Sequence, residues 1–94
     1  MTPEGFIAAA LLREAETAGL FIRKCRWEGR VGCPDYLVIR HGAAIFIETK
    51  APGEHPRKSQ IAEFAKIKEH GVTVYVVDTA EKAKKAINDI CERY

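Results

Sequence analysis

The stretch GCPDYLVIRHGAAIFIETK, Gly32–Lys50, decides the fold of this chain. It contains two runs of β-branched and aromatic residues with the tripeptide HGA between them, a pattern that predicts an antiparallel hairpin. Three charged residues stand in these apolar runs: Asp35 begins the first, and Glu48 and Lys50 end the second. Charges in apolar strands cost free energy unless they are paired or bind something. The hairpin therefore predicts a functional site as well as a part of a sheet.

Hairpin geometry places these charges close together. Side chains alternate between the two faces of a strand, so Glu48 and Lys50 point the same way and Thr49 points the opposite way. A turn centred near the glycine of HGA puts Asp35 across from Glu48 or Thr49, and directly opposed residues have Cβ atoms about 4.5–5.5 Å apart. Two carboxylates that close repel one another unless a proton or a cation lies between them. Such oxygen ligands favour Mg²⁺ or Mn²⁺, beside which Lys50 can orient or deprotonate water or neutralise a phosphate.

A simpler interpretation is an ion pair between Asp35 and Lys50 across the end of the sheet. Such pairs are common and contribute little stability. This interpretation leaves Glu48 without a purpose in a strand otherwise made of isoleucine and phenylalanine. The geometry alone leaves both interpretations open.

The rest of the chain adds elements on both sides of the hairpin. Helical spacing of apolar residues predicts helices, and short alternating or continuous apolar runs predict strands. The expected elements are a helix within 2–19, strands within 20–27, 35–40 and 44–50, a helix within 59–71, a strand at 72–78 and a helix within 79–94. This order predicts one α/β domain, 1–94, with a mixed four-stranded sheet flanked by helices and its last two strands parallel. The nearly continuous apolar run 72–78 predicts a central strand buried on both faces.

Capping residues and periodicity add detail to the helices. The expected N-caps are Thr2, Ser59 and Thr79. The expected apolar positions are Phe6, Ala10, Leu11 and Ala15 or Ala18 in the first helix, and Ala83, Ala86, Ile87 and Ile90 in the last.

The overall composition is that of an ordinary globular domain, with 47% hydrophobic and 30% charged residues. The net charge of +2 is too small to indicate nucleic-acid binding by itself. The three cysteines lack metal-binding spacing and predict reduced thiols in a cytoplasmic protein. Neither a membrane span nor a signal peptide is expected. Because so short a chain buries a modest core, we expect a homodimer, for which the last helix is one candidate surface.

The motifs together resemble a known family. Pro34–Asp35, followed after a hairpin by Glu48–Lys50, resembles the PD-(D/E)xK nuclease signature, which is weak by itself. The ordered set GCPD, IFIETKAPG, RKSQ and GVTVYVVD is more specific and resembles the VRR-NUC domain, the virus-type replication-repair nuclease of phages and of an interstrand-crosslink repair enzyme. The similarity runs from the first helix to the last strand. Cys33 departs from the pattern, where a small aliphatic residue is expected.

The resemblance implies a restriction-endonuclease-like core and a divalent metal, Mg²⁺ or Mn²⁺. The implied ligands are Asp35, Glu48 and the main-chain carbonyl of Thr49. Lys50 takes the place of the family's lysine. Gln60 takes the place of the glutamine that helps to position the lysine, the water or the phosphate.

The resemblance also implies an acidic metal ligand from the first helix. Glu4 is the first choice and Glu14 is the second. The alternative for Glu4 is a carboxylate that the positive end of the helix dipole stabilises.

The implied function is a metal-dependent, structure-selective DNA endonuclease similar to Holliday-junction resolvases, a phosphodiester hydrolase of phage or bacterial origin. A flap- or nick-specific nuclease and a non-catalytic nucleic-acid-binding module with a degenerate nuclease fold are the alternatives.

Trp27 either packs at a strand end or stacks on an exposed base. The DNA-binding candidates, which could equally be solvated loop residues, are Arg26, Arg30, Arg57 and Lys58.

Overall fold

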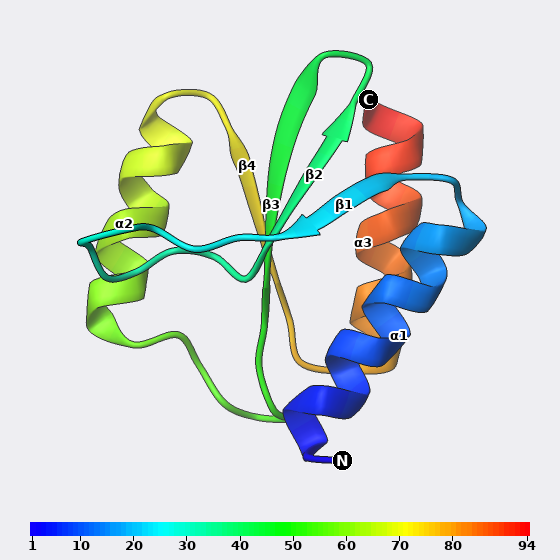
Figure 1. Cartoon of the computed structure of the whole chain (residues 1–94), viewed down its shortest axis with the longest axis horizontal. Helices are drawn as coiled ribbons and strands as arrows, with labels where there is room; N and C mark the ends of the chain where they lie inside the picture. The colour runs from blue at the N-terminus through cyan, green and yellow to red at the C-terminus, as the bar shows by residue number, and fades with distance from the viewer.

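The computed structural model describes residues 1–94, and its elements follow the expected order (Figure 1). They are α1 (Pro3–Thr17), β1 (Phe21–Lys24), β2 (Tyr36–Arg40), β3 (Ala43–Thr49), α2 (Lys58–Glu69), β4 (Thr73–Val77) and α3 (Ala80–Arg93). The strands form one mixed sheet in the order β1-β2-β3-β4, with β3 antiparallel to β2 and parallel to β4. The α/β class and the parallel crossover are therefore confirmed. None of the helices is long and apolar enough to cross a membrane.

Helices cover the two faces of the sheet unequally. α1 and α3 lie side by side on one face, and α2 lies on the other (Figure 1). The alternation of side chains along β3 explains this arrangement. Ile45 and Ile47 point into the core with α1 and α3, whereas Phe46 and Glu48 point to the side of α2. The charged residue that interrupts β3 therefore faces α2 rather than the apolar core.

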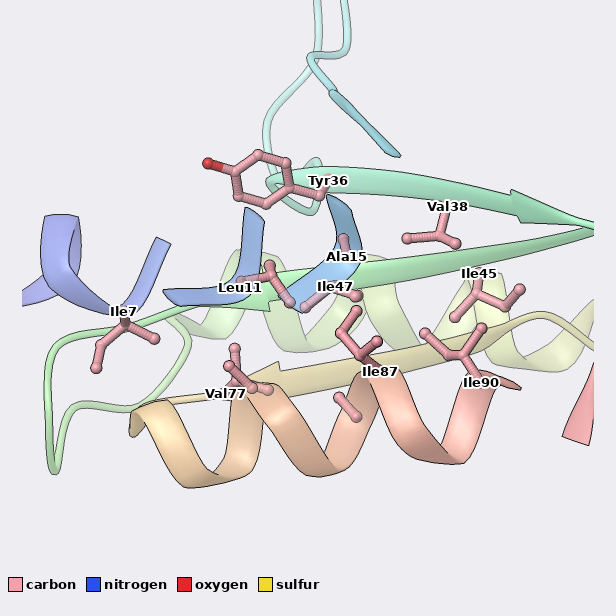
Figure 2. Close-up of a cluster of buried hydrophobic side chains, with 12 residues drawn as sticks. Ile7, Leu11, Ala15, Tyr36, Val38, Ile45, Ile47, Val77, Ile87 and Ile90 are labelled. Carbon is pink, nitrogen blue, oxygen red and sulfur yellow. The ribbon is translucent and has the colours of Figure 1, made fainter. Parts of the chain in front are cut away.

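The hydrophobic core lies between the sheet and the α1–α3 pair (Figure 2). Val38 and Ile45 from the hairpin meet Leu11 of α1 and the fully buried Ile87 and Ile90 of α3. The inward positions predicted for α3 are confirmed. Because Ile87 and Ile90 are buried against the sheet, they are not available to a second copy of the chain.

The prediction that strand 72–78 is central is wrong, because β4 is an edge strand. Val77 is buried, but Val76 is 40% exposed on the face that α2 covers only in part. A continuous apolar run fits an edge strand here because helices approach β4 from both sides.

Two details of the helices also differ from expectation. α2 begins at Lys58 with Arg57 as N-cap, so Ser59 lies within the first turn and does not cap the helix. In α1 the core position belongs to Ile7, whereas Phe6 is 63% exposed. The caps at Thr2 and Thr79 are confirmed, since each hydroxyl accepts a hydrogen bond from an N–H of the first turn.

Candidate active site

Asp35 and Glu48 meet at the end of the hairpin. Tyr36 pairs with Ile47, so the next pair outward is Asp35 with Glu48. The backbone N–H of Asp35 donates to Oε1 of Glu48 over 3.1 Å. In return, Oδ2 of Asp35 accepts from the N–H of Thr49 at 3.0 Å and from its hydroxyl at 2.8 Å. The register that the sequence predicts therefore brings both carboxylates to one place.

Gln60 connects this strand end to the first turn of α2. Its Nε2 donates to Oε2 of Glu48 over 2.7 Å. Its Oε1 accepts from Nζ of Lys50 at 3.0 Å and from the N–H of Arg57 at 2.9 Å. The amide is thus fully oriented, with its oxygen toward donors and its nitrogen toward a carboxylate. Gln60 is only 6% exposed, so it belongs to the site rather than to the helix surface.

Lys50 shares the face of Glu48, as strand alternation requires. Its Nζ lies 3.2 Å from Oε2 of Glu48. Lys50 therefore pairs with Glu48 and not with Asp35, and the simple cross-strand ion pair between Asp35 and Lys50 is wrong. The lysine side chain keeps partial exposure to solvent, which leaves its ammonium within reach of a bound ligand.

The charges of the site do not balance. Glu48 is 1% exposed, and burial followed by the nearby charge of Asp35 raises its pKa above the ordinary value, although Lys50 and Gln60 oppose this change. Two carboxylates and one ammonium leave an excess of negative charge. Oδ1 of Asp35 makes no hydrogen bond and is open to a ligand. This donor set fits a hard divalent cation that keeps part of its water shell.

The structure does not bring a helix carboxylate to this pair. Glu4 is exposed near the start of α1, and Glu14 is half-buried near its end. No group of three or more His, Cys, Asp and Glu side chains converges anywhere in the chain. Neither glutamate therefore joins Asp35 and Glu48 in this conformation.

The four basic candidates differ in their surroundings. Arg30 forms a two-pronged ion pair with Glu63 of α2, with both contacts at 3.0 Å. This pairing raises the pKa of Arg30 and lowers that of Glu63. Arg26, Arg57 and Lys58 are exposed and form no ion pair. Arg30 thus holds the loop before Asp35 against α2, and the other three remain available to an anionic ligand.

The segment before Asp35 is held by contacts that the sequence did not reveal. The N–H of Cys25 donates to the carbonyl of Asp35 over 2.7 Å, which continues the β1–β2 pairing to the site. Trp27 is half-buried and packs edge-to-face on Phe46, with ring centroids 5.9 Å apart. Its packing role is therefore observed. Burial, followed by the neighbouring Cys25, raises the pKa of Cys33 to about 12.

Comparisons with known proteins agree with this fold. The chain is 38% identical over 79 residues to "Putative nuclease p44" of Acyrthosiphon pisum secondary endosymbiont phage 1, which covers 83% of this chain and 85% of that protein. A solved structure described as "VRR_NUC domain" superposes with a TM-score of 0.81 and 30% identity, covering 100% of this chain and 99% of the other. No protein-family model matches the chain. The relative and the solved structure nevertheless show that the chain belongs to the VRR-NUC family of nuclease domains.

Proposed function

We propose that this protein is a metal-dependent endonuclease that hydrolyses phosphodiester bonds in branched DNA. The observation that carries the proposal is the network of Asp35, Glu48, Lys50 and Gln60 at the end of β3. It combines buried like charges, an adjacent ammonium and an open oxygen in a chain of the VRR-NUC family. The phage origin of its relative supports a phage-encoded or bacterial protein that acts in the cytoplasm.

Asp35, Glu48 and the main-chain carbonyl of Thr49 would hold Mg²⁺ or Mn²⁺. When bound, such an ion supplies positive charge to the scissile phosphate and lowers the pKa of a water molecule. The hydrogen bonds from Thr49 fix the Asp35 carboxylate so that Oδ1 points away from the strand contact. Gln60 and the N–H of Asp35 fix the two oxygens of Glu48 in the same way. The protein therefore holds both acidic side chains before any ligand arrives.

Lys50 is the residue that we assign to the chemical step. Its ammonium is held by Gln60 and Glu48, and these contacts restrict the positions that Nζ can occupy. From there it can orient the attacking water or stabilise negative charge that develops on the phosphate. Gln60 acts as a positioning residue, because it holds Lys50 and Glu48 at once. Arg57 and Lys58 begin the same helix and would bind the DNA backbone beside the site.

We further propose that the protein works as a homodimer on four-way junctions. Cutting two opposed strands requires two sites, and a twofold axis supplies them. The 94-residue chain contributes one such network, that of Asp35, Glu48, Lys50 and Gln60. Phe21 and Ile39 are cross-strand neighbours on an edge of the sheet, and both are exposed. These two residues, rather than α3, are the surface that we assign to the second copy.

The experiment is cleavage of a panel of labelled DNAs: four-way junction, flap, nicked and linear duplex. We expect Mn²⁺- or Mg²⁺-dependent cutting of the junction, with symmetric cuts in opposed strands. Preference for the flap or nick would replace the junction assignment with the alternative substrate. Binding without any cutting, in either metal, would identify a non-catalytic module.

Asp35→Asn is the control for this panel. Asparagine keeps an oxygen for Thr49 but removes the negative charge, so the hairpin should survive while metal affinity falls. Calorimetric titration with Mn²⁺ measures that loss directly. Unchanged Mn²⁺ affinity would mean that Asp35 is a structural residue and not a metal ligand.

A further inference from the structure

Two cysteine thiols lie next to one another beside the candidate active site. Cys25 follows β1 and Cys33 immediately precedes Pro34–Asp35, yet their Sγ atoms are 3.4 Å apart. Both side chains are half-buried, so a small reagent can reach them. The remaining cysteine, Cys91 on α3, lies elsewhere and contacts Arg40. The fold therefore brings together two of the three thiols.

The thiol pair is connected directly to the segment that carries Asp35. The Cys25 N–H donates to the carbonyl of Asp35 over 2.7 Å. Cys33 lies two residues before Asp35, and its Sγ lies 3.2 Å from the carbonyl of Pro34. Short contacts thus join both cysteines to the backbone that positions Asp35. On the opposite side, the hydrogen bonds from Thr49 hold the Asp35 carboxylate in place.

We propose that Cys25 and Cys33 are a redox-reactive dithiol, which a small-molecule disulfide converts to an internal disulfide that reduces DNA cleavage. In the first step Cys25 loses its proton and attacks the reagent, forming a mixed disulfide and releasing one small thiolate. The second cysteine loses its proton and attacks the mixed disulfide, forming the Cys25–Cys33 bond and releasing the second thiolate. The two protons pass to the two released thiolates. Two electrons pass from the cysteine pair to the reagent, which leaves as two thiols.

The geometry explains why cleavage should fall. A disulfide holds its sulfurs about 2.05 Å apart, so the present 3.4 Å separation must shorten by more than an ångström. Both cysteines adjoin the Asp35 backbone, so a shift of either segment on closing the bond changes the position that Thr49 and Glu48 give to Asp35. Misplacing a reacting group by about 1 Å can cost about 100-fold in rate. The loss of activity rests on the proposed function, whereas the formation of the bond does not.

The test compares reduced protein with protein treated with oxidised glutathione. Peptide mapping should find a Cys25–Cys33 link with the loss of two hydrogen atoms, and Cys91 outside it. Junction cleavage should fall at least tenfold and return with dithiothreitol, and Mn²⁺ affinity should fall in parallel. Cys91→Ser should respond like the unchanged chain. Cys25→Ser should form no link, and its cleavage should survive the treatment.

Two outcomes overturn the proposal. Glutathione adducts without a Cys25–Cys33 link would show that the pair is not a reactive dithiol. A link that leaves both cleavage and Mn²⁺ affinity unchanged would show that it does not act on Asp35. If the reduced protein cuts none of the DNAs, the proposed nuclease function fails separately, and the link and the Mn²⁺ titration still decide the redox proposal.

Discussion

At the scale of single residues, Glu48 is placed where a charge is costly. The carboxylate is buried on the face of β3 toward α2, and Asp35 adds a second negative charge nearby. Lys50 and Gln60 compensate in part, yet the pKa of Glu48 is still raised. Active sites commonly lose stability in this way, because a bound ligand supplies the charge that balances such a group. A substitution at Glu48 that removes its charge should therefore change stability and function in opposite directions.

Glu48→Gln should stabilise the metal-free protein at neutral pH. Because the folded pKa is raised, the folded chain binds a proton at Glu48 more readily than the unfolded chain, so stability falls as pH rises from the ordinary value of 4.5 through the folded value. Glutamine removes the buried charge, and this gain should outweigh the cost of turning its NH2 group toward a donor, so its Tm should exceed that of the unchanged chain at neutral pH in chelator. The difference should vanish below the ordinary carboxyl pKa. Thermal melts across this pH range measure it.

Added Mn²⁺ should reverse the order of the two proteins. It should raise the Tm of the unchanged chain and leave that of Glu48→Gln nearly unaltered, because a ligand stabilises only the protein that binds it. A variant that is less stable at neutral pH without metal would mean that the Lys50 ion pair outweighs the burial of Glu48.

At the scale of elements, the loop between β1 and β2 controls the position of Asp35. The loop packs on α2, where Arg30 pairs with Glu63 and Gly32 lies against the helix. A Cβ atom on Gly32 would lie 2.8 Å from Cβ of Glu63 and 3.0 Å from the carbonyl oxygen of Ser59. Gly32 also has a φ of +95°, which side chains disfavour. This close contact holds Asp35 at a fixed distance from Gln60 of α2.

Gly32→Ala should therefore damage both stability and cleavage. Gly29→Ala is the matched control, because Gly29 also has a positive φ, +68°, but nothing within 4 Å. Left-handed backbone alone costs about 1–2 kcal/mol, which both variants should lose from the free energy of unfolding. Gly32→Ala should lose more and should cleave more slowly at saturating metal. Urea titration and cleavage rates measure this, and equal losses in the two variants would show that contact with α2 is unimportant.

Much of this architecture could be predicted from short-range patterns. The hairpin register follows from alternation and the short turn, and it placed Asp35 across from Glu48 or Thr49, both of which Asp35 contacts in the structure. The edge position of β4 could not be predicted, since an apolar run describes burial and not strand order. Contacts between segments that lie far apart in the sequence could not be predicted either. Arg30 pairs with a residue 33 positions away, so no local pattern could separate it from the free cations.

At the scale of the whole molecule, the sheet has one face that its helices leave partly open. α2 packs mainly on β4, while Phe21 of β1 and Ile39 of β2 stay exposed. β1 is also an edge strand, with no neighbour on its outer side. An unpaired edge beside exposed apolar side chains favours association with another chain. The homodimer of the proposed function would use this part of the molecule.

Light scattering at micromolar concentration should therefore give twice the chain mass of 10.5 kDa. Phe21→Lys should give the single-chain mass, because a charge at the centre of an apolar contact opposes burial. Val31→Lys is the control, since Val31 is also exposed but lies in the loop; this variant should remain dimeric. A single-chain mass for the unchanged protein would remove the paired cleavage of junctions.

If Lys50 participates in the chemical step of a nuclease, its removal should affect the cleavage rate far more than DNA binding. Single-turnover cleavage of a four-way junction is compared for Lys50→Ala and the unchanged chain, and junction binding is measured in Ca²⁺ to suppress chemistry. Lys58→Ala, which alters an exposed basic residue of α2, is the control and should weaken binding modestly.

We expect Lys50→Ala to lower the cleavage rate by about two to four orders of magnitude, the usual range for a general acid–base or electrostatic group, with little loss of affinity. Comparable losses in rate and affinity, each below about tenfold, would contradict it and would make Lys50 a binding residue like Lys58.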